Sequence, residues 1–460
     1  MITRADAERK LSASGQSHVL RWFDELDGAG QEKLLGQIEA LDLAWLVRVL
    51  ETPELAVDPA SITPYEELIP LGAPDAAEAR ARGEAALRAG EVACILVAGG
   101  QGSRLGFDGP KGAFVLGPVS GRTLFQMHVE RLVALGRRYG AVPPLYLMTS
   151  PDNHEATCRI FADADRFGLP EDRLLIFPQG LAPAVDEQGR LLLEERGSLV
   201  LAANGNGGLF AALAGSGALA QMERLGVRAA SYVQVDNPLS LSCDPRFVGY
   251  HLLRQSDYSC KAIPKVHPAE KVGAYARVGG RLSVVEYTVI PEALAESRDA
   301  RGALRYGYAN PGLFVWSVPF LREQAERDDL PYHRAHKKIP HLDPSGRRVE
   351  PSAPCGYKLE TFAMDTLPDA RRSLVLEIDR DEEFAPVKNA SGVDSPDSAR
   401  GLMSALYRRW IAEAGGTLSG DGAVEVSPLY ALDGGELAAR LPVGFRAETP
   451  LYLGPKSPAR

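Results

Sequence analysis

The sequence predicts an α/β protein built on a doubly wound, mostly parallel sheet. Apolar stretches typical of buried strands, at 92–97, 145–148, 174–177 and 231–235, alternate with helical stretches such as 124–135 and 208–225. This alternation favours parallel strands joined by crossover helices. The first of these strands runs directly into Gly99, Gly100 and Gly102. Because ligands of such sheets bind beyond the carboxyl ends of the strands, we expect the functional site there.

The composition agrees with this class of protein and excludes several others. The 460 residues are 45% hydrophobic and 24% charged, which is ordinary for a globular protein and excludes a largely disordered one. The net charge of -9 argues against a general nucleic-acid binder or a polybasic membrane anchor. The five cysteines show no CxxC spacing, no apolar run is long enough to span a membrane, and the first residues do not resemble a secretory signal. We therefore expect a cytoplasmic protein without a nucleic-acid or membrane partner, and no protein partner is implied.

Helices are expected at both ends of the chain. The first sixty residues carry two helical stripes, Val19 to Leu26 and Leu34 to Leu50, with a break at Gly28 and Gly30. Further helices are expected over 75–89 and 399–414, and short strands over 424–430 and 449–453. These patterns predict an N-terminal helical region at 1–90, a sheet domain at 91–390 and a small C-terminal region at 391–460.

The most informative segment is the glycine loop LVAGGQGSRLGFDGPKGAF at 96–114. It is not the dinucleotide fingerprint, because the third glycine falls one residue late at Gly106, and no GK[ST] follows as in a Walker A loop. Glycines after a buried strand expose backbone N–H groups, and Arg104 and Lys111 add two cations. This combination indicates a polyphosphate ligand.

A strand followed by GGQGSRLG and PKG resembles the uridylyltransferases that make UDP-sugars. Colinear segments along nearly the whole chain are similar to the UDP-N-acetylhexosamine pyrophosphorylase branch: MTSPDNH (148–154), PQGLAPAV (178–185), NGNGGLFAAL (204–213), VDNPL (235–239), VVEY (284–287), YKLETFAMD (357–365) and EFAPVKN (383–389). The resemblance implies a nucleotidyltransferase (GT-A-like) sheet at 91–390, flanked by an N-terminal helical piece and a small C-terminal β piece. It also implies that UTP and N-acetylglucosamine 1-phosphate give a UDP-sugar and pyrophosphate.

The resemblance also implies roles for individual residues. It implies nucleotide binding by Gly99, Gly100, Gly102, Lys111, Gln179, Gly205, Asp236 and Lys358, with Gln179 reading uracil. It implies sugar-phosphate binding by Asn206, Gly273, Glu286, Tyr287, Asn310 and Lys388, and catalytic roles for Arg104, Lys111 and Lys388. Since the attacking phosphate oxygen is already ionised near pH 7, the reaction needs aligned anions and neutralised charge rather than a general base.

A divalent cation is the cofactor expected for this chemistry. Asp236 follows the predicted strand 231–235, and a carboxylate there is a natural ligand for Mg²⁺, with phosphates and waters completing the octahedron. A second protein ligand is not evident. His333 and His336 lie at helical spacing, but no third metal ligand accompanies them, so we set a metal pair aside. The acidic run 379–383 is interpreted as a solvated turn that positions Lys388.

One departure from the family pattern concerns the sugar. The family commonly carries a second Asn and a His shortly after the position of Asn310, where this chain has Leu313 and Phe314. We expect these two side chains to contact the acetyl methyl group or to narrow the sugar pocket.

Three alternatives remain at this point. A UTP–glucose-1-phosphate uridylyltransferase or a broad UDP-sugar pyrophosphorylase would differ from the main interpretation in its turnover of glucose 1-phosphate. A nicotinamide-dependent oxidoreductase is disfavoured by the displaced third glycine and would have to bind NADH. A non-catalytic sugar-nucleotide sensor is disfavoured because Lys111, Asp236 and Lys388 are all retained.

Overall fold

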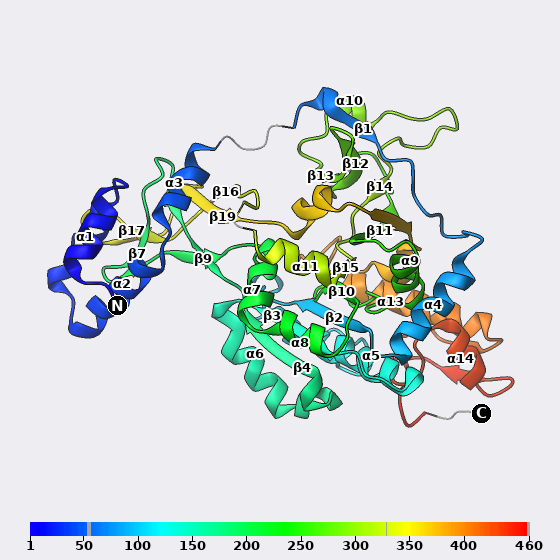
Figure 1. The fold of residues 1–460 in the computed structure, drawn as a ribbon. Helices are drawn as coiled ribbons and strands as arrows, with labels where there is room; N and C mark the ends of the chain where they lie inside the picture. The colour runs from blue at the N-terminus through cyan, green and yellow to red at the C-terminus, as the bar shows by residue number, and fades with distance from the viewer. Residues whose placement is uncertain (53–56, 328, 458–460) are drawn as a thin grey trace. The chain divides into compact units, whose positions relative to one another are not determined.

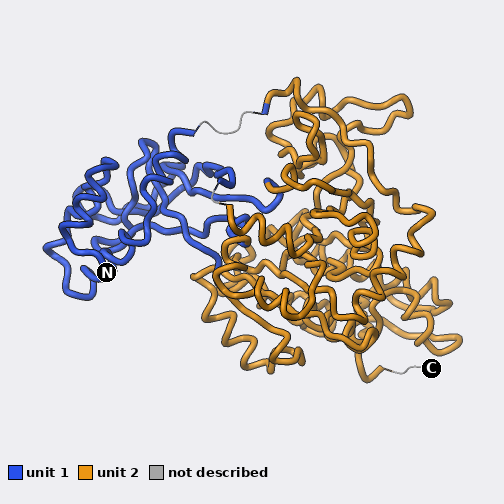
Figure 2. Tube along the Cα trace, viewed as in Figure 1, with its two compact units in different colours: residues 1–57, 179–209, 328–365 blue, residues 58–178, 210–327, 366–460 orange. Residues whose placement is uncertain are grey.

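The computed structural model describes residues 1–52, 57–327 and 329–457 (Figure 1). The chain forms two compact units, each assembled from three separate stretches of sequence (Figure 2). Unit 1 comprises Met1–Val57, Gln179–Leu209 and Asp328–Asp365; unit 2 comprises Asp58–Pro178, Phe210–Arg327 and Thr366–Arg460. The boundaries at 90 and 390 remain predictions, whereas these compact units group residues 58–90 and 391–460 with the large sheet.

Unit 2 is organised around an 11-stranded sheet. Its strands are β1 (Ile62–Pro64), β2 (Val92–Val97), β3 (Leu145–Thr149), β4 (Leu174–Pro178), β10 (Ala229–Gln234), β11 (Tyr258–Pro264), β12 (Ala274–Val278), β13 (Arg281–Val285), β14 (Tyr308–Ala309), β15 (Phe314–Ser317) and β20 (Ser373–Glu377). The order is β1-β12-β14-β11-β15-β10-β2-β3-β4, with β13 paired to β12 and β20 paired to β11.

The central part of this sheet is mostly parallel, as predicted. Strands β4, β3, β2 and β10 pair in parallel, and so do β11 and β20. Strand β15 runs antiparallel between β10 and β11, so β11 and β20 keep the direction of the other parallel strands. The antiparallel extension formed by β1, β12, β13 and β14 was not predicted from the sequence.

The helices of unit 2 follow the predicted crossover pattern. They are α4 (Ala76–Arg88), α5 (Leu124–Tyr139), α6 (Pro151–Asp163), α7 (Leu209–Gly215), α8 (Ala218–Arg224), α9 (Pro245–Leu253), α10 (Glu292–Ala295), α11 (Val318–Ala325), α12 (Arg380–Glu383), α13 (Pro396–Glu413) and α14 (Gly434–Arg440). The stretch 208–225 forms two helices instead of one, because Gly217 adopts a φ of 78° that ends the first.

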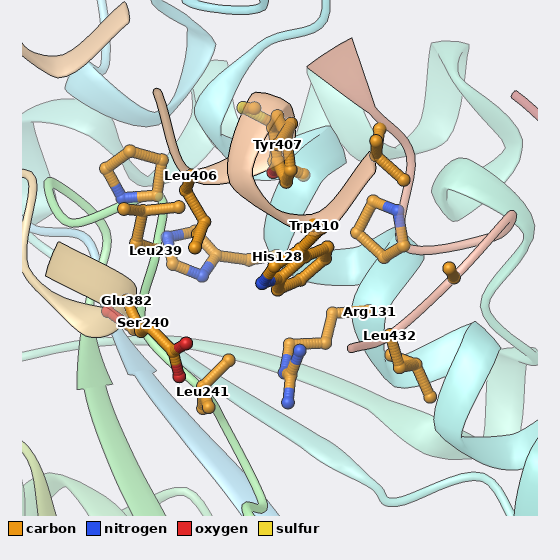
Figure 3. A pocket seen from close by; sticks show the side chains of 15 residues that line it. His128, Arg131, Leu239, Ser240, Leu241, Glu382, Leu406, Tyr407, Trp410 and Leu432 are labelled. Atoms are coloured by element: carbon orange, nitrogen blue, oxygen red, sulfur yellow. The ribbon is translucent and has the colours of Figure 1, made fainter. Parts of the chain in front are cut away.

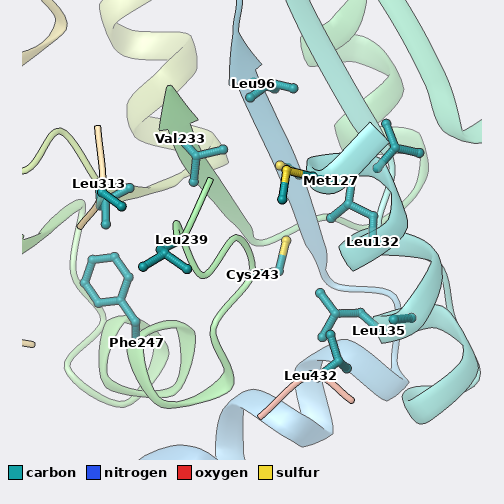
Figure 4. Packing of buried hydrophobic residues seen from close by; sticks show 14 of the residues in the cluster. Leu96, Met127, Leu132, Leu135, Val233, Leu239, Cys243, Phe247, Leu313 and Leu432 are labelled. Carbon is teal, nitrogen blue, oxygen red and sulfur yellow. The ribbon is translucent and has the colours of Figure 1, made fainter. Parts of the chain in front are cut away.

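One hydrophobic core joins the sheet to the C-terminal segment. Leu96 and Val233 from the strands pack with Met127 and Leu132 from α5, and Leu432 from the C-terminal segment belongs to the same cluster (Figure 4). The C-terminal strands β21 (Thr417–Ser419), β22 (Val424–Val426), β23 (Arg446–Glu448) and β24 (Leu451–Leu453) form two parallel pairs. The C-terminal segment therefore shares the core of the sheet.

Unit 1 combines the N-terminal helices with strands from two later stretches. Its helices are α1 (Arg4–Ser12), α2 (Gly28–Ala40) and α3 (Leu43–Glu51), and its strands are β5 (Leu181–Pro183), β6 (Val185–Asp186), β7 (Leu193–Glu195), β8 (Ser198–Leu199), β9 (Leu201–Ala203), β16 (His333–Lys337), β17 (His341–Leu342), β18 (Arg348–Val349) and β19 (Gly356–Glu360). Leu34, Ile38 and Leu46 of the helices pack with Leu193 and Leu359 of the strands.

Two local expectations for unit 1 were wrong. Gly28 and Gly30 do not break a helix, because Asp27 accepts a hydrogen bond from the Gly30 N–H and caps the start of α2. His333 and His336 do not lie on a helix either, because β16 pairs with β19 across its whole length. Within the described ranges, no helix is long and apolar enough to cross a membrane.

Helices α4 and α9 approach closely enough to require two glycines. A Cβ atom on Gly83 of α4 would lie 1.8 Å from the Pro245 carbonyl oxygen, and one on Gly249 of α9 would lie 1.6 Å from the Ala79 carbonyl oxygen. Side chains at these positions would therefore force the two helices apart.

We expect Gly83→Ala to lower the free energy of unfolding by about 2 kcal/mol or more, because the helices must separate to admit the methyl group. Gly401→Ala is the matched control, since a Cβ atom there has no neighbour within 4 Å. It should leave stability unchanged or raise it by about 0.5–1 kcal/mol. Equal unfolding curves for the two variants, followed by circular dichroism, would contradict the close packing.

Candidate active site

The glycine loop after β2 is folded back on itself. The Gly102 N–H donates to the Gly109 carbonyl oxygen at 2.8 Å, and the Lys111 N–H donates to the Gly100 carbonyl oxygen at 3.0 Å. A Cβ atom on Gly102 would lie 2.6 Å from the Phe107 ring. Gly102 is therefore needed for the close packing of Phe107 inside the loop.

Asn153 of α6 holds the start of this loop, and the sequence analysis did not assign it a role. Its Nδ2 donates to the carbonyl oxygens of Ala98 at 2.9 Å and Gly100 at 3.3 Å. Its Oδ1 accepts from the Ser150 N–H at 2.9 Å, and the side chain is 1% exposed. A buried amide with both ends bonded fixes the loop against α6, and the MTSPDNH motif was the available signal.

Two predicted residues and the backbone just before a third meet beyond the ends of β2 and β10. The Lys111 Nζ lies 3.6 Å from the Asp236 Oδ2, and both side chains are largely buried. The same Nζ lies 3.5 Å from the Val387 carbonyl oxygen, and the Val387 N–H donates to the Asp236 carbonyl oxygen at 2.8 Å. Lys388 follows directly, so its segment is anchored beside Lys111 and Asp236.

Asn237 clamps the segment that leads to Lys388. Its Nδ2 donates to the Glu383 carbonyl oxygen at 2.7 Å, and its Oδ1 accepts from the Ala385 N–H at 3.0 Å. Asn237 is 3% exposed. These bonds satisfy backbone groups that burial would otherwise leave unpaired, and they place the segment at the end of β10.

A buried charge cluster includes Glu383, the first residue of the same segment. It shows that one expectation was wrong. The Lys261 Nζ lies 2.5 Å from the Glu383 Oε2 and 2.8 Å from the Asp244 Oδ2. Burial raises the pKa of the Glu383 carboxyl, whereas Lys261 outweighs the effect of burial at Asp244 and lowers the pKa of that carboxyl. The run 379–383 is therefore not a solvated turn, since its last residues form α12 and Glu383 is buried.

The two remaining predicted catalytic cations are exposed. Arg104 lies in the short 3-10 helix Ser103–Leu105 of the glycine loop. Lys388 is exposed at its side chain, while its backbone N–H donates to the Asp394 carbonyl oxygen at 2.6 Å. Exposed ammonium and guanidinium groups beside a rigid loop can reach a phosphate without leaving a buried charge unpaired.

Three of the predicted sugar contacts lie together at the open end of the β12–β13 hairpin, away from its turn. The Asn310 N–H donates to the Gly273 carbonyl oxygen at 2.9 Å, and a Cβ atom on Gly273 would lie 3.4 Å from the Glu286 Oε1. The Asn310 Oδ1 accepts from the Gly312 N–H at 2.9 Å and lies 3.0 Å from the Tyr275 hydroxyl. Tyr287 is adjacent and 43% exposed. Their roles in sugar binding remain predictions.

Leu313 and Phe314 belong to the hydrophobic core of unit 2. Both side chains are buried, and Phe314 packs with its ring centroid 5.3 Å from Tyr232 and 5.2 Å from Tyr258. Because β15 is inserted between β10 and β11, its residues are buried in the sheet core. Their contact with the sugar remains a prediction.

The other predicted contacts belong to unit 1. Gln179 is buried directly after β4, and Lys358 lies on β19 opposite Ala335 of β16. The Asn206 Oδ1 accepts from the Ala363 N–H at 2.8 Å, so one end of this amide is used inside the unit. The assigned roles in uridine, sugar and phosphate binding remain predictions.

Thr361 holds the loop that carries Gly205 and Asn206, and the sequence analysis did not identify it. Its N–H donates to the Asn204 carbonyl oxygen at 2.8 Å, and its carbonyl oxygen accepts from the Gly207 N–H at 2.9 Å. Gly205 has a φ of 84°, and a Cβ atom there would lie 2.3 Å from the Thr361 carbonyl oxygen. Gly205 therefore makes room for the Thr361 backbone, and its role in nucleotide binding remains a prediction.

A small cavity behind β10 is not a substrate site. His128 and Arg131 of α5, Glu382 of α12 and Trp410 of α13 line a space of about 50 Å³ (Figure 3). That volume holds a few waters at most. The His128 Nε2 is 3.1 Å from the Val235 carbonyl oxygen, and burial lowers the pKa of His128 to about 4. This imidazole is therefore neutral near pH 7.

The residues around Asp236 fit a magnesium ion held mainly by phosphates. Among the described residues no three His, Cys, Asp or Glu side chains cluster as a metal site, so an ion beside Asp236 would need phosphates and waters for most of its ligands. Mg²⁺ commonly takes one or two carboxylates and completes its octahedron with substrate phosphates and waters. His333 and His336 instead contact Asp365 at 2.8 Å and Glu187 at 3.0 Å.

A parallel sheet whose strand ends carry a glycine loop, a paired lysine and aspartate, and a second lysine segment defines a nucleotidyltransferase. The profile of the family described as UTP–glucose-1-phosphate uridylyltransferase matches residues 51–425. The chain belongs to this family, which confirms the resemblance seen in the motifs.

Two relatives are similar to this chain over nearly its whole length. UDP-N-acetylglucosamine diphosphorylase 2 of Arabidopsis thaliana is 35% identical, covering 94% of this chain and 90% of its own length. UDP-N-acetylglucosamine pyrophosphorylase of Saccharomyces cerevisiae is 32% identical, covering 94% and 96%.

Solved structures of UDP-sugar pyrophosphorylases superpose on this chain. The uridine diphosphate N-acetylglucosamine pyrophosphorylase of Trypanosoma brucei, in complex with an inhibitor, superposes with a TM-score of 0.82 at 29% identity over 95% of this chain and 94% of its own. A UDP-glucose pyrophosphorylase of Leishmania major in complex with UDP-glucose gives 0.61 at 19% identity, over 83% and 80%, and shares the fold.

We expect Gly205→Ala to lower the free energy of unfolding by about 2 kcal/mol, because the methyl group meets the Thr361 backbone at a φ that favours glycine. Gly36→Ala in α2 is the control within the same unit, since a Cβ atom there has open space. Thermal unfolding measures both variants. If Gly205→Ala is as stable as Gly36→Ala, the contact with Thr361 does not constrain the loop.

Proposed function

We propose that this chain makes UDP-N-acetylglucosamine and pyrophosphate from UTP and N-acetylglucosamine 1-phosphate. An ionised oxygen of the sugar phosphate attacks the α-phosphorus of UTP and forms a new P–O bond. The bond from that phosphorus to the β-phosphate breaks, and pyrophosphate leaves with the bonding electrons. The meeting of Lys111, Asp236 and the Lys388 segment beyond β2 and β10 is the observation that carries this proposal.

The side chains in unit 2 would act by position and charge. Lys111 is held between Asp236 and the Val387 carbonyl oxygen, so its ammonium is oriented before any substrate binds. Arg104 and the bare N–H groups of Gly99 and Gly100 would hold the UTP phosphates, and exposed Lys388 would bind the phosphate of the sugar. No proton has to be removed from the nucleophile, because the phosphate oxygen is already ionised near pH 7.

Magnesium is part of this proposal. Asp236 would hold the ion, and when bound Mg²⁺ supplies charge neutralisation on the UTP phosphates. The pairing with Lys111 orients the Asp236 carboxylate beside the glycine loop.

Asp236→Asn is expected to reduce magnesium-dependent turnover by roughly 10²-fold, since an amide is a far weaker ligand for Mg²⁺. Binding of UTP measured without magnesium should stay within a few-fold of the parent value. Asp397→Asn is the control, because that carboxylate is exposed and pairs only with Arg400 among the described residues. A parent-like rate and magnesium dependence in Asp236→Asn would leave Asp236 without a metal role.

The preference for an N-acetylated sugar rests on two observations. The relatives that match nearly the whole chain at 32–35% identity are named for UDP-N-acetylglucosamine, whereas the solved UDP-glucose enzyme is 19% identical. Asn310 is retained and is held rigidly by Gly312 and Gly273 at the end of the hairpin. Loss of one hydrogen bond to the 2-acetamido group with a 2-hydroxyl sugar would cost about 1–3 kcal/mol.

A panel of sugar 1-phosphates tests the function directly. Pyrophosphate release from UTP should be about 5- to 150-fold more efficient, in kcat/KM, with N-acetylglucosamine 1-phosphate than with glucose 1-phosphate. Asn310→Ala should reduce this ratio more than it weakens UTP binding. Equal or better turnover of glucose 1-phosphate would replace the proposal by a UDP-glucose or broad UDP-sugar enzyme.

A cytoplasmic location is part of the same proposal. It is supported by free cysteines at 94, 158, 243, 260 and 355, because thiols persist in a reducing compartment.

A further inference from the structure

Unit 2 contains a second cavity that the proposed reaction does not use. Its volume is about 750 Å³, within the range of small-molecule sites. It is lined by Ser256 before β11, by Ser373 and Leu374 at the start of β20, and by the β12–β13 turn. Asp236 follows the carboxyl end of β10, and β11 and β20 run in the same direction as β10. The cavity therefore lies at the opposite edge of the sheet from the catalytic loop.

Arginine dominates the lining of this cavity. Five arginines line it, Arg254, Arg277, Arg281, Arg371 and Arg372, against two acidic residues, Glu67 and Asp369. This leaves an excess of three positive charges in a chain whose net charge is -9. A local excess of positive side chains around one space attracts anions.

Two of these guanidinium groups lack a carboxylate partner among the described residues. Arg281 makes one long contact, 3.4 Å from its Nη1 to the Pro368 carbonyl oxygen. Arg372 donates from its Nη1 to the Gln255 Oε1 at 2.8 Å, and its other guanidinium nitrogens have no described partner. Both therefore keep N–H donors for a ligand.

The other three arginines are paired and define the walls. Arg254 contacts Asp75 at 2.9 Å, Arg371 contacts Glu323 at 3.2 Å, and Arg277 pairs with Glu67. Arg277 also lies over the ring of Tyr65, 5.4 Å from its centroid. Of the two acidic lining residues, Asp369 forms an ion pair with Arg327, which does not line the cavity.

We propose that this arginine-lined cavity is a second anion site, which takes a polyphosphate. Guanidinium groups bind phosphate oxygens in a bidentate manner, and an anion with several phosphates can bridge groups from the β12–β13 turn and from the segment before β20. The site goes beyond the proposed reaction and does not depend on it.

Calorimetric titration of the full-length protein with sodium tripolyphosphate at low salt tests the site. The titration is done in the Lys111→Ala background, which weakens binding at the glycine loop. Adding Arg281→Ala and Arg372→Ala should weaken the remaining binding by 10-fold or more. The control adds Arg137→Ala and Arg159→Ala, two exposed arginines outside the cavity, and should change the affinity by less than 2-fold.

Equal affinities in the cavity variant and the control would overturn the proposal, as would the absence of binding in the Lys111→Ala protein. Arg281→Glu alone keeps the test valid if the double substitution does not fold. Because the Arg281 side chain is exposed, this variant should fold, and its affinity for tripolyphosphate should fall by 10-fold or more.

Adenosine triphosphate titrated in the same way identifies the source of the ligand. The same dependence on both arginines indicates a nucleotide, and binding of tripolyphosphate alone indicates an inorganic polyphosphate. Turnover of Arg281→Ala/Arg372→Ala without tripolyphosphate should equal that of the parent. Failure of the proposed sugar-nucleotide reaction would therefore be seen in the turnover of sugar 1-phosphates, and failure of the anion site would be seen only in the titration.

Discussion

The hydrogen bonding of Asp236 and Asn237 to the segment 383–388 is the constraint on which the active site depends. It ties the end of β10 to a segment almost 150 residues later in the chain, through both the Asn237 amide and the Asp236 backbone. The buried ion pairs of Lys261 with Glu383 and Asp244 also hold the start of this segment. Breaking one member of such a cluster leaves an uncompensated charge, so the segment has one well-defined position.

The glycines near the site act mainly through close backbone approach. Gly102 admits the Phe107 ring, and Gly205 admits the Thr361 carbonyl oxygen. In both cases the loop is held by neighbouring protein groups, Asn153 in unit 2 and Thr361 in unit 1. A loop that is already ordered loses less conformational entropy when a nucleotide binds. Such packing therefore lowers the free-energy cost of binding.

Much of the fold could be predicted because its signals are local. The strand 92–97 has the predicted bounds, since a run of buried apolar residues followed by glycines has few other solutions. The helices over 76–88 and 396–413 differ from the prediction by a few residues at their ends. The antiparallel extension could not be predicted, because pairing among β1, β12, β13 and β14 depends on contacts between residues far apart in sequence.

The sequence by itself determined the fold class, the glycine loop and, through its motifs, the family. It also determined that Lys111, Asp236 and Lys388 lie in motifs of the site, because residue type and local spacing carry that information. Only the tertiary structure decided that Lys111 meets Asp236, that Glu383 is buried with Lys261, and that Leu313 and Phe314 belong to the core. Burial and long-range hydrogen bonding arise from the packing of distant segments, and neither leaves a signal in local sequence.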